Sequence, residues 1–252
     1  MPEGGISTCL FLIVLFLKNN SEKERGSRMK VEIRLEEGSD AYQAEDGTVL
    51  LTVRKTLPVV RIEGGETAAA VINEAVRSYV KSGNMSGVSV DEILGWTKAD
   101  YERRGRDNWK AYELETVYET KRADEKIISF KIVNDSYTGG AHPNVVAGGM
   151  TFDTQTGRRL AFADVVKDEK AAMTLVREFL LQETKKEVYA GMFFEGYEAQ
   201  LGELLKEDTW YLSEVGMHVI GNEYIIAPHA AGIFDFVIPY AQADFMRDEF
   251  KR

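Results

Sequence analysis

The stretch WKAYELETVYETKRADEKIISFKIVNDSY, residues 109–137, is the part of the sequence that most directly indicates the fold. In its first half, apolar and aromatic side chains alternate with glutamates, and in its second half Ile128, Phe130 and Ile132 repeat the alternation. A period of two is typical of a β-strand with one packed face and one wetted face. The short segment RADE between the halves predicts a hairpin connection. We therefore expect two antiparallel strands here.

The residues before this hairpin indicate a further strand and two helices. Residues 44–62 form a β-branched run that Pro58 interrupts, which fits a strand that bends at a sheet edge or a bulge. Residues 64–81 and 91–108 have the apolar spacing of amphipathic helices, and in the second helix we expect Trp96 to face inward.

The residues after the hairpin continue with strands and helices. Residues 145–166 predict a strand, a turn at Thr156 and Gly157, and a short strand. Residues 168–205 carry two helical stripes, and residues 209–240 contain three short strands. Helices that are grouped between runs of antiparallel strands favour the α+β class over a parallel doubly wound sheet.

The predicted fold is therefore α+β, with antiparallel sheets, amphipathic helices packed on them, and a two-part organisation. The length of 252 residues allows one large domain or two small ones. We expect residues 1–28 to be a leader or a disordered linker, residues 29–150 to form a first α+β domain, and residues 151–252 to form a second.

The net charge of the chain argues against nucleic acids as partners and favours a cationic partner. Thirty-one basic and forty-one acidic side chains give a formal net charge of −10. Nucleic-acid binding depends on neutralising phosphates with basic groups, so DNA and RNA are poor candidates. An acidic surface can instead steer a cationic partner into contact.

The N-terminal segment leaves the compartment open. The apolar run from Cys9 to Leu17 is shorter than the roughly 20 residues that a membrane-spanning helix needs, so we predict no true membrane span. As a secretory signal it lacks a preceding basic residue and a cleavage site, whereas translation from Met29 would leave a protein without a targeting signal. Because Cys9 is the single cysteine, no disulfide can form within the chain.

The residues that could carry chemistry do not form a recognisable catalytic or metal-binding pattern. His142, His218 and His229 lack the close spacing of zinc ligands. The glutamates Glu113 and Glu115 could serve as an acid and base pair, but alternate positions on a solvated strand face explain them more simply. We predict no catalytic residue, no metal and no cofactor.

The segment DSYTGGAHPN, residues 135–144, differs from these isolated residues because several of its residues determine the backbone conformation. Gly139 and Gly140 allow a positive φ or the close approach of another segment, and Pro143 keeps His142 extended. A rigid loop of this kind can orient an imidazole, or it can simply carry the chain between sheets. We favour the structural use over catalysis.

A family resemblance rests on three segments that occur in the same order as in the family. They are SYTGGAHPN at 136–144, MTFDTQTGRRLAFADVV at 150–166 and EYIIAPHAAGIFDFVIPY at 223–240. Over residues 44–245 the chain resembles the extracytoplasmic region of RsiV-type anti-sigma factors and the N-terminal region of PdaC-type peptidoglycan deacetylases. Residues 29–150 are similar to the PdaC-type part, and residues 151–252 to the RsiV-type part.

This resemblance implies a two-part α+β module without catalytic machinery of its own, which binds lysozyme outside the cell in RsiV-type proteins. Only about 28 residues precede the module and the sequence ends at Arg252, so we expect neither anti-sigma nor deacetylase activity. His229 stands where the family usually has an aromatic residue, often tyrosine. The binding residues that the resemblance indicates are Tyr137, Gly139, Gly140, Ala141, His142, Pro228 and His229.

The resulting prediction is a non-enzymatic, extracytoplasmic binding or sensing module. Its expected partner is a cationic, lysozyme-like protein or another cell-wall component. One alternative is an enzyme that acts on cell-wall glycan or peptide through His142 and nearby carboxylates. Another alternative is a cytosolic protein that starts at Met29.

Overall fold

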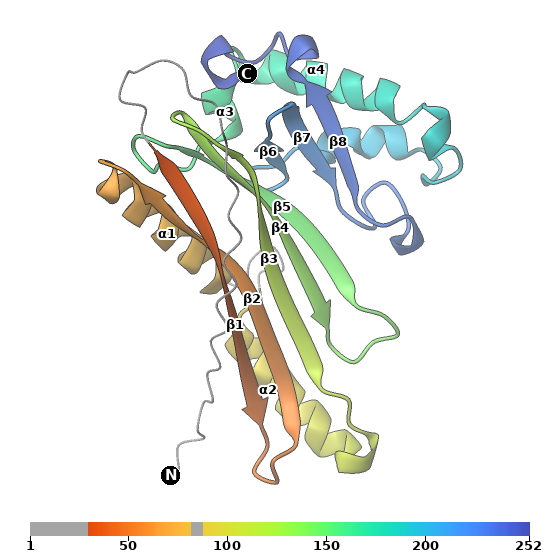
Figure 1. Ribbon diagram of the computed structural model, residues 1–252. Coiled ribbons are helices and arrows are strands. Elements are labelled where there is room, and N and C mark those ends of the chain that lie inside the picture. Colours follow the sequence, from red (N-terminus) through yellow and green to blue (C-terminus); the bar gives the residue numbers. More distant parts are fainter. Residues whose placement is uncertain (1–29, 82–87) are drawn as a thin grey trace.

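The structure, a computed structural model, describes residues 30–81 and 88–252, and these form two sheets with helices packed on them (Figure 1). The α+β class predicted from the sequence is confirmed. The expected leader, the apolar run from Cys9 to Leu17 and the alternative start at Met29 lie outside the described residues. No helix in the described ranges has the length and apolar character needed to cross a bilayer.

The larger sheet has five strands in the order β1-β2-β3-β4-β5. Their bounds are β1 Val31–Gln43, β2 Val49–Ile62, β3 Tyr112–Ala123, β4 Ile127–Tyr137 and β5 Asn144–Asp153. The predicted hairpin is present as β3 and β4, which pair antiparallel. The prediction of antiparallel sheets is wrong for one pair of neighbours, because β2 and β3 run parallel. Helices α1 and α2 carry the chain from the end of β2 back to the other end of the sheet, and such a crossover makes the next strand parallel.

Pro58 lies where the pairing between β2 and β3 has ended. That pairing runs only as far as Thr56 on β2, so the missing N–H of the proline interrupts no bond to β3. Beyond it, the side-chain amide of Asn73 on α1 accepts from the Val60 N–H at 2.8 Å and donates to the Val60 carbonyl at 2.9 Å. The helix thus completes the hydrogen bonding of a strand edge that β3 leaves open.

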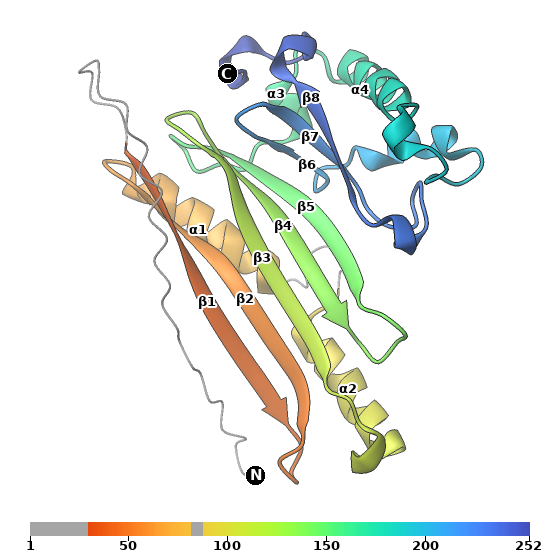
Figure 2. The same ribbon diagram turned by 45° about the vertical axis from the view of Figure 1, so that its right-hand side comes forward.

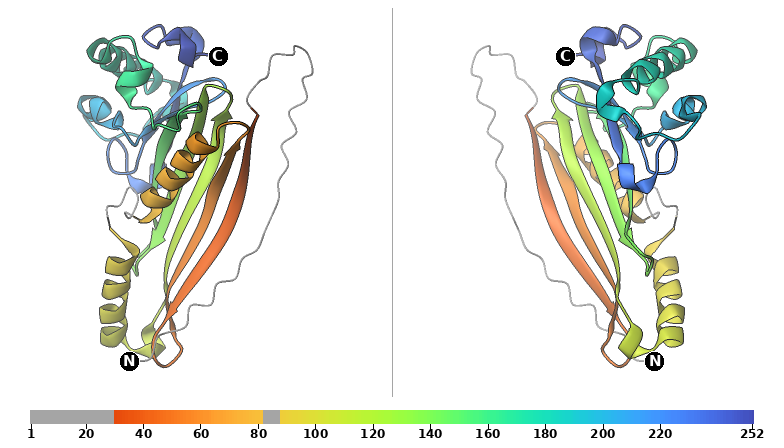
Figure 3. Two further views of the ribbon diagram at one scale, coloured as in Figure 1. Left: turned by 90° about the vertical axis from the view of Figure 1, so that its left-hand side faces the viewer. Right: turned by 90° about the vertical axis from the view of Figure 1, so that its right-hand side faces the viewer.

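Two helices, α1 (Glu66–Lys81) and α2 (Val90–Arg104), cover one face of the larger sheet and follow one another along it (Figure 3). Ser89 and Glu92 form a capping box at the start of α2. The inward stripe of α2 is centred on Ile93, Thr97 and Asp100. Trp96 is 55% exposed, so the prediction that it faces inward is wrong: its position falls at the edge of that stripe.

The smaller sheet has the order β6-β7-β8 and packs one face on β4 and β5, while α4 covers its other face (Figure 2). Its bounds are β6 Trp210–Leu212, β7 Gly216–Gly221 and β8 Phe234–Pro239, which confirms the three predicted short strands. The α-helices of this part are α3 Phe162–Val165 and α4 Glu169–Glu183. The 3-10 helices of the described residues are η2 Arg106–Asn108, η3 Glu187–Tyr189, η4 Tyr197–Leu204, η5 His229–Ala231, η6 Tyr240–Gln242 and η7 Asp248–Phe250.

The two sheets meet along β5. A Cβ atom at Gly149 would lie only 2.1 Å from the carbonyl oxygen of Trp210, so glycine is needed for this approach. The side-chain amide of Asn222 accepts from the Ala147 N–H at 2.7 Å and donates to the Ala147 carbonyl at 2.9 Å. These contacts bind the end of β7 to β5 as a further strand would.

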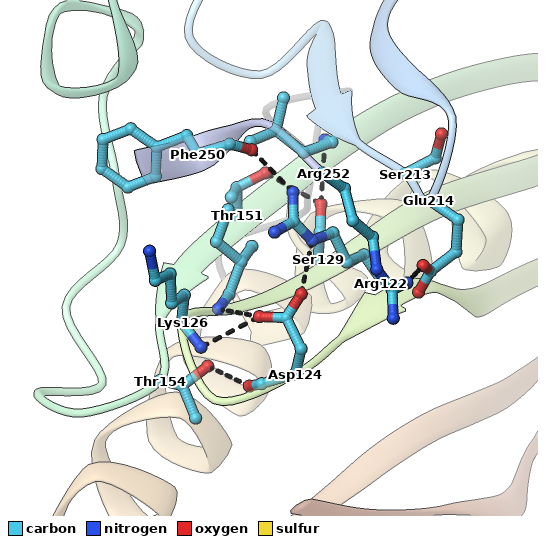
Figure 4. Close-up of polar contacts among 12 residues, drawn as sticks. Arg122, Asp124, Lys126, Ser129, Thr151, Thr154, Ser213, Glu214, Phe250 and Arg252 are labelled. Carbon is cyan, nitrogen blue, oxygen red and sulfur yellow. Dashed lines mark hydrogen bonds and ion pairs between the residues drawn. The ribbon is translucent and has the colours of Figure 1, made fainter. Parts of the chain in front are cut away.

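A buried arginine also joins the two parts (Figure 4). The Arg122 guanidinium donates to Asp124 Oδ2 at 2.7 Å, to the Phe250 carbonyl at 2.7 Å and to the Tyr240 hydroxyl at 2.9 Å. Asp124 Oδ1 accepts the N–H groups of Lys126 and Ile127, which forms the turn predicted from RADE. Burial raises the pKa of Asp124, but the bonds from Arg122 and the two N–H groups outweigh it and lower the pKa below its ordinary value.

Candidate functional site

The predicted loop joins β4 to β5, and its second residue is a glycine that the position requires. Gly139 has φ +86°, and a Cβ atom there would lie 3.0 Å from the ring of Tyr112. Gly140 has no such requirement, because the atom nearest to a Cβ there would be the His142 carbonyl oxygen at 3.7 Å. Tyr137, at the end of β4, lies under the ammonium group of Lys110, which is 3.9 Å from the ring centre. The N-terminal end of the loop is therefore held by the ring of Tyr112, which lies against Gly139, and by the contact of Tyr137 with Lys110.

The two loops that the sequence singles out come together in the structure. The rings of His142 and His229 stack, with centroids 3.8 Å apart and planes 14° apart. His142 Nδ1 lies 2.8 Å from the Pro143 carbonyl oxygen, and His229 Nδ1 lies 2.6 Å from Glu223 Oε2. Both imidazoles are thus held at Nδ1. Ala141 and Pro228, which precede the two histidines, are exposed.

A third ring extends this stack. Tyr224 is 57% exposed, and its ring lies nearly parallel to that of His229 at a centroid distance of 6.2 Å. Its φ of +64° is the only positive value at a non-glycine residue in the described chain, and such a conformation costs on the order of 1–3 kcal/mol. We call Tyr224, His229 and His142 the ring column. Tyr224 was not among the predicted binding residues, because nothing in the sequence marks it as strained or exposed.

Acidic side chains lie close to the ring column. Glu115 on β3 stands directly opposite Asp135 on β4, and Glu113 is two residues before Glu115. The pKa of Asp135 is raised by burial and by the charges of Glu115, Glu113 and Glu223, while Arg54 lowers it by less. We call Glu113, Glu115, Asp135 and Glu223 the acidic strip. Arg54 pairs with Glu113 at 2.6 Å and with Glu115 at 3.8 Å, and the Glu223 side chain is only 7% exposed. The three carboxylates of Glu113, Glu115 and Asp135 still outnumber this one guanidinium, so the surface keeps a negative charge.

A second polar network lies between the sheets and involves the third histidine. Asp235 accepts from Lys131 Nζ at 2.7 Å and from the Tyr211 hydroxyl at 2.8 Å, and its Oδ1 is 2.7 Å from His218 Nδ1. His218 Nε2 is 2.9 Å from Ser213 Oγ. Burial raises the pKa of Asp235, but the hydrogen bonds from His218, Lys131 and Tyr211 hold it far below its usual range.

The connectivity of Ser213, His218 and Asp235 is that of a nucleophile, base and orienting acid. The surroundings favour a structural role. Ser213 is only 7% exposed, and its hydroxyl oxygen already accepts the Val215 N–H at 3.2 Å. Lys131 belongs to β4, so the network ties the smaller sheet to the larger one.

The described residues hold no group of three or more histidine, cysteine or acidic side chains that could bind a metal ion.

The F-D-x-x-T-G motif at residues 152–157, which lies in the second segment of the family resemblance, has a structural use. A Cβ atom at Gly157 would lie 2.4 Å from the Ala68 carbonyl of α1, so the glycine lets this turn pack against the helix. Phe152, at the start of the motif, is buried in the core beneath α1.

The fold is a two-part α+β module, and its two facing loops form a candidate site where the parts meet. Residues 163–241 match the model of a protein family of unknown function, DUF3298, and residues 58–145 match the model of a family described as deacetylase PdaC. The chain therefore contains one region that matches each model, and the resemblance found in the sequence is confirmed. His142 belongs to the PdaC region and His229 to the DUF3298 region, so the ring column joins the two.

Two crystal structures share this fold. A member of the DUF3298 family from Bacteroides fragilis has a TM-score of 0.62 and 14% identity, over 87% of this chain and 94% of that chain. A DUF3298 family protein from Pseudomonas aeruginosa has a TM-score of 0.54 and 15% identity, over 88% of this chain and 96% of that chain. No curated protein matches the chain.

Proposed function

We propose that this protein is a non-enzymatic, extracytoplasmic binding module, and that its partner is a cationic protein of the lysozyme type. The observation that carries the proposal is the stacking of His142 on His229, which unites the two loops at the surface beside the acidic strip. The extracytoplasmic location and the type of partner follow from the family resemblance.

The chemistry of the surface supports a cationic partner. Tyr224 offers an exposed ring, and tyrosine is among the residues that most often dominate binding energy. The acidic strip and the net charge of −10 attract basic groups and speed their encounter. Because exposed charges are screened by salt, the association should weaken as ionic strength rises.

Calorimetric titration with a lysozyme, at low and at physiological salt, tests this proposal. We expect heat of binding at low salt and a weaker affinity at physiological salt. The substitution Tyr224→Ala should weaken binding about tenfold or more, since truncation of a central tyrosine costs roughly 2 kcal/mol. Val215→Ala is the matched control, because Val215 is 63% exposed but lies in the turn between β6 and β7, at the opposite end of β7 from Asn222.

Two results would count against the proposal. Absence of heat at both salt concentrations would exclude a lysozyme as the partner. Binding that is unchanged by Tyr224→Ala but weakened by Val215→Ala would exclude the ring column as the contact surface.

A further inference from the structure

The strand β1 leaves one edge of the larger sheet open. It is the first strand in the sheet order, and among the strands of residues 30–81 and 88–252 it pairs only with β2. Figure 2 shows β1 along the margin of the sheet that is farthest from the smaller sheet. An open edge presents unpaired N–H and C=O groups, and it is a template for pairing with another strand. The sequence of β1 therefore either prevents such pairing or specifies it.

The hydrogen bonds to β2 determine which residues of β1 direct their backbone groups outward. The Glu63 N–H donates to the Lys30 carbonyl at 3.0 Å, so the backbone groups of Lys30 face β2. In an antiparallel pair, successive residues alternate between facing the neighbouring strand and facing away from it. The pairing with β2 keeps one register over this segment. The N–H and C=O groups of Val31, Ile33 and Leu35 therefore point to the open edge.

The segment KVEIRLE, residues 30–36, is complementary to itself in antiparallel orientation. When two copies align with Ile33 opposite Ile33, each apolar residue meets an apolar residue and each charge meets the opposite charge. The opposed pairs are Lys30 and Glu36, Val31 and Leu35, Glu32 and Arg34, and Ile33 with itself. Opposite charges and apolar side chains that stand directly across two strands stabilise a sheet.

The direction of the backbone groups fits the same alignment. Ile33 faces Ile33, and Val31 faces Leu35, as hydrogen-bonded pairs in which the two residues exchange both N–H···O bonds. Glu32 and Arg34 then stand at non-hydrogen-bonded positions, where opposed Cα atoms are only about 4.5 Å apart and the side chains lie closest. Their side chains already pair within the strand at 3.0 Å, so both lie on one face of the sheet.

Neighbouring alignments are less favourable. Centring the pair on Arg34 places two like charges opposite one another, which destabilises a sheet. Centring it on Leu35 places Ile33 opposite Glu37, so an apolar side chain meets a charge. Centring it on Glu36 or Glu37 places two glutamates opposite one another. The charge pattern of β1 therefore favours the alignment centred on Ile33 over its neighbours.

Apolar side chains at this edge gain cover in the same arrangement. Val31 and Ile33 are only partly buried where they pack against the core beneath α1, and Leu35 is half-buried as well. A second copy covers their open sides and extends this core from one sheet into the next. Removal of apolar surface from water is the main favourable contribution to most protein association.

We propose that the protein forms a symmetric dimer in which the β1 strands of two copies pair antiparallel over residues 30–36, about a two-fold axis at Ile33. Such an interface is isologous, because the same surface of each copy is used. The ring column lies at the loop between β4 and β5, at the other end of the sheet order, so the dimer leaves both ring columns free. The dimer goes beyond the proposed binding function and does not depend on the identity of the partner.

Sedimentation equilibrium and amide hydrogen exchange on the full chain test the proposal. Physiological salt screens the repulsion between the two acidic chains beyond about 8 Å. Under this condition the dimer fraction should rise as the protein concentration is raised from about 1 µM to about 1 mM, the range of weak association. A monomer at every concentration overturns the proposal.

Hydrogen exchange locates the contact on β1. The amides of Ile33 and Leu35 should become protected at the higher concentrations, because they donate to the second copy. Those of Ser39 and Ala41 also point to the open edge but lie beyond the paired segment, so they should stay unprotected. Equal protection of the two sets, or protection of neither in a dimer, overturns the proposal.

Charge reversals test the alignment. Arg34→Glu alone and Glu32→Arg alone each place like charges at both symmetric positions, and each should weaken dimerisation about tenfold or more. The double variant restores opposite charges and should dimerise as the parent does. An equimolar mixture of the two single variants should form a heterodimer for the same reason. Glu37→Arg is the matched control, because it changes the net charge as Glu32→Arg does but lies outside the paired segment, and it should not weaken dimerisation.

Melting curves accompany these variants, because Arg61 of β2 lies opposite Glu32 and a reversal there also affects the sheet itself. Single reversals that are folded and dimerise as the parent does overturn the proposal. A folded double variant that stays monomeric, together with a mixture that forms no heterodimer, overturns it as well.

Discussion

Replacement of Arg122 by methionine should destabilise the protein strongly, because Arg122 joins the hairpin of the larger sheet to the C-terminal segment. The side chain is 3% exposed and makes hydrogen bonds to Asp124, Tyr240 and the Phe250 carbonyl. Methionine has similar length but leaves Asp124 as a largely buried carboxylate without its cation. Breaking a buried ion pair from one side costs about 3–5 kcal/mol. At roughly 2–4 °C per kcal/mol for a chain of this size, Tm should fall by about 6–20 °C.

Urea unfolding and thermal melting, both followed by circular dichroism, measure this loss. Arg34→Met is the matched control, because Arg34 pairs with Glu32 at 3.0 Å on the exposed surface of β1. An exposed pair of this kind contributes about 0–1 kcal/mol. If both variants lose similar amounts of free energy of unfolding, the buried arginine does not hold the two parts together.

Two further predictions concern the junction of the sheets. Gly149→Ala should lower the free energy of unfolding by about 1–3 kcal/mol, because its Cβ would be forced against the Trp210 carbonyl, whereas Gly38→Ala, with no atom within 4 Å, should cost little in the same urea titration. A comparable loss in both variants would contradict the close approach. Asp235→Asn should flatten the acid limb of a stability-versus-pH curve. The folded pKa of Asp235 is depressed, so its contribution is present above the unfolded value of about 3.9 and is lost as pH falls below it towards the folded pKa. Curves of equal slope for the parent and the variant between about pH 5 and pH 2 would exclude this contribution.

Local patterns in the sequence predicted most of the strands and helices. They did not predict β1, and the short strand expected after the turn at Thr156 and Gly157 is wrong, because the chain forms the helix α3 there. The alternation around Tyr118 and Phe130 is a property of single strands, and both side chains are buried as expected. Ser129 and Ile127 are buried as well, because the smaller sheet covers the second face of β4, and no local pattern reveals a second packed face. The parallel pairing of β2 and β3 depends in the same way on how two helices cross the sheet.

The candidate site was predictable in its parts and not in its arrangement. The glycines and Pro143 mark one loop, and the resemblance marks the loop around His229, but neither indicates that the two imidazoles stack. That contact depends on tertiary packing between segments far apart in the chain. Tyr224 was missed for a related reason, because its positive φ follows from the path of the loop and not from the residue type.

The edge of β5 explains how the ring column keeps its geometry. The first loop leads directly into β5, and Asn222 binds Ala147 on the same strand through two hydrogen bonds. Glu223 and Tyr224 follow Asn222 in the chain, so the residues that hold His229 start from a point fixed on β5. The loop of His142 and the loop of Tyr224 and His229 are therefore both anchored to β5. A partner would meet rings whose positions are already set. A surface that needs little ordering on binding loses less of its interaction energy to restricted side-chain freedom.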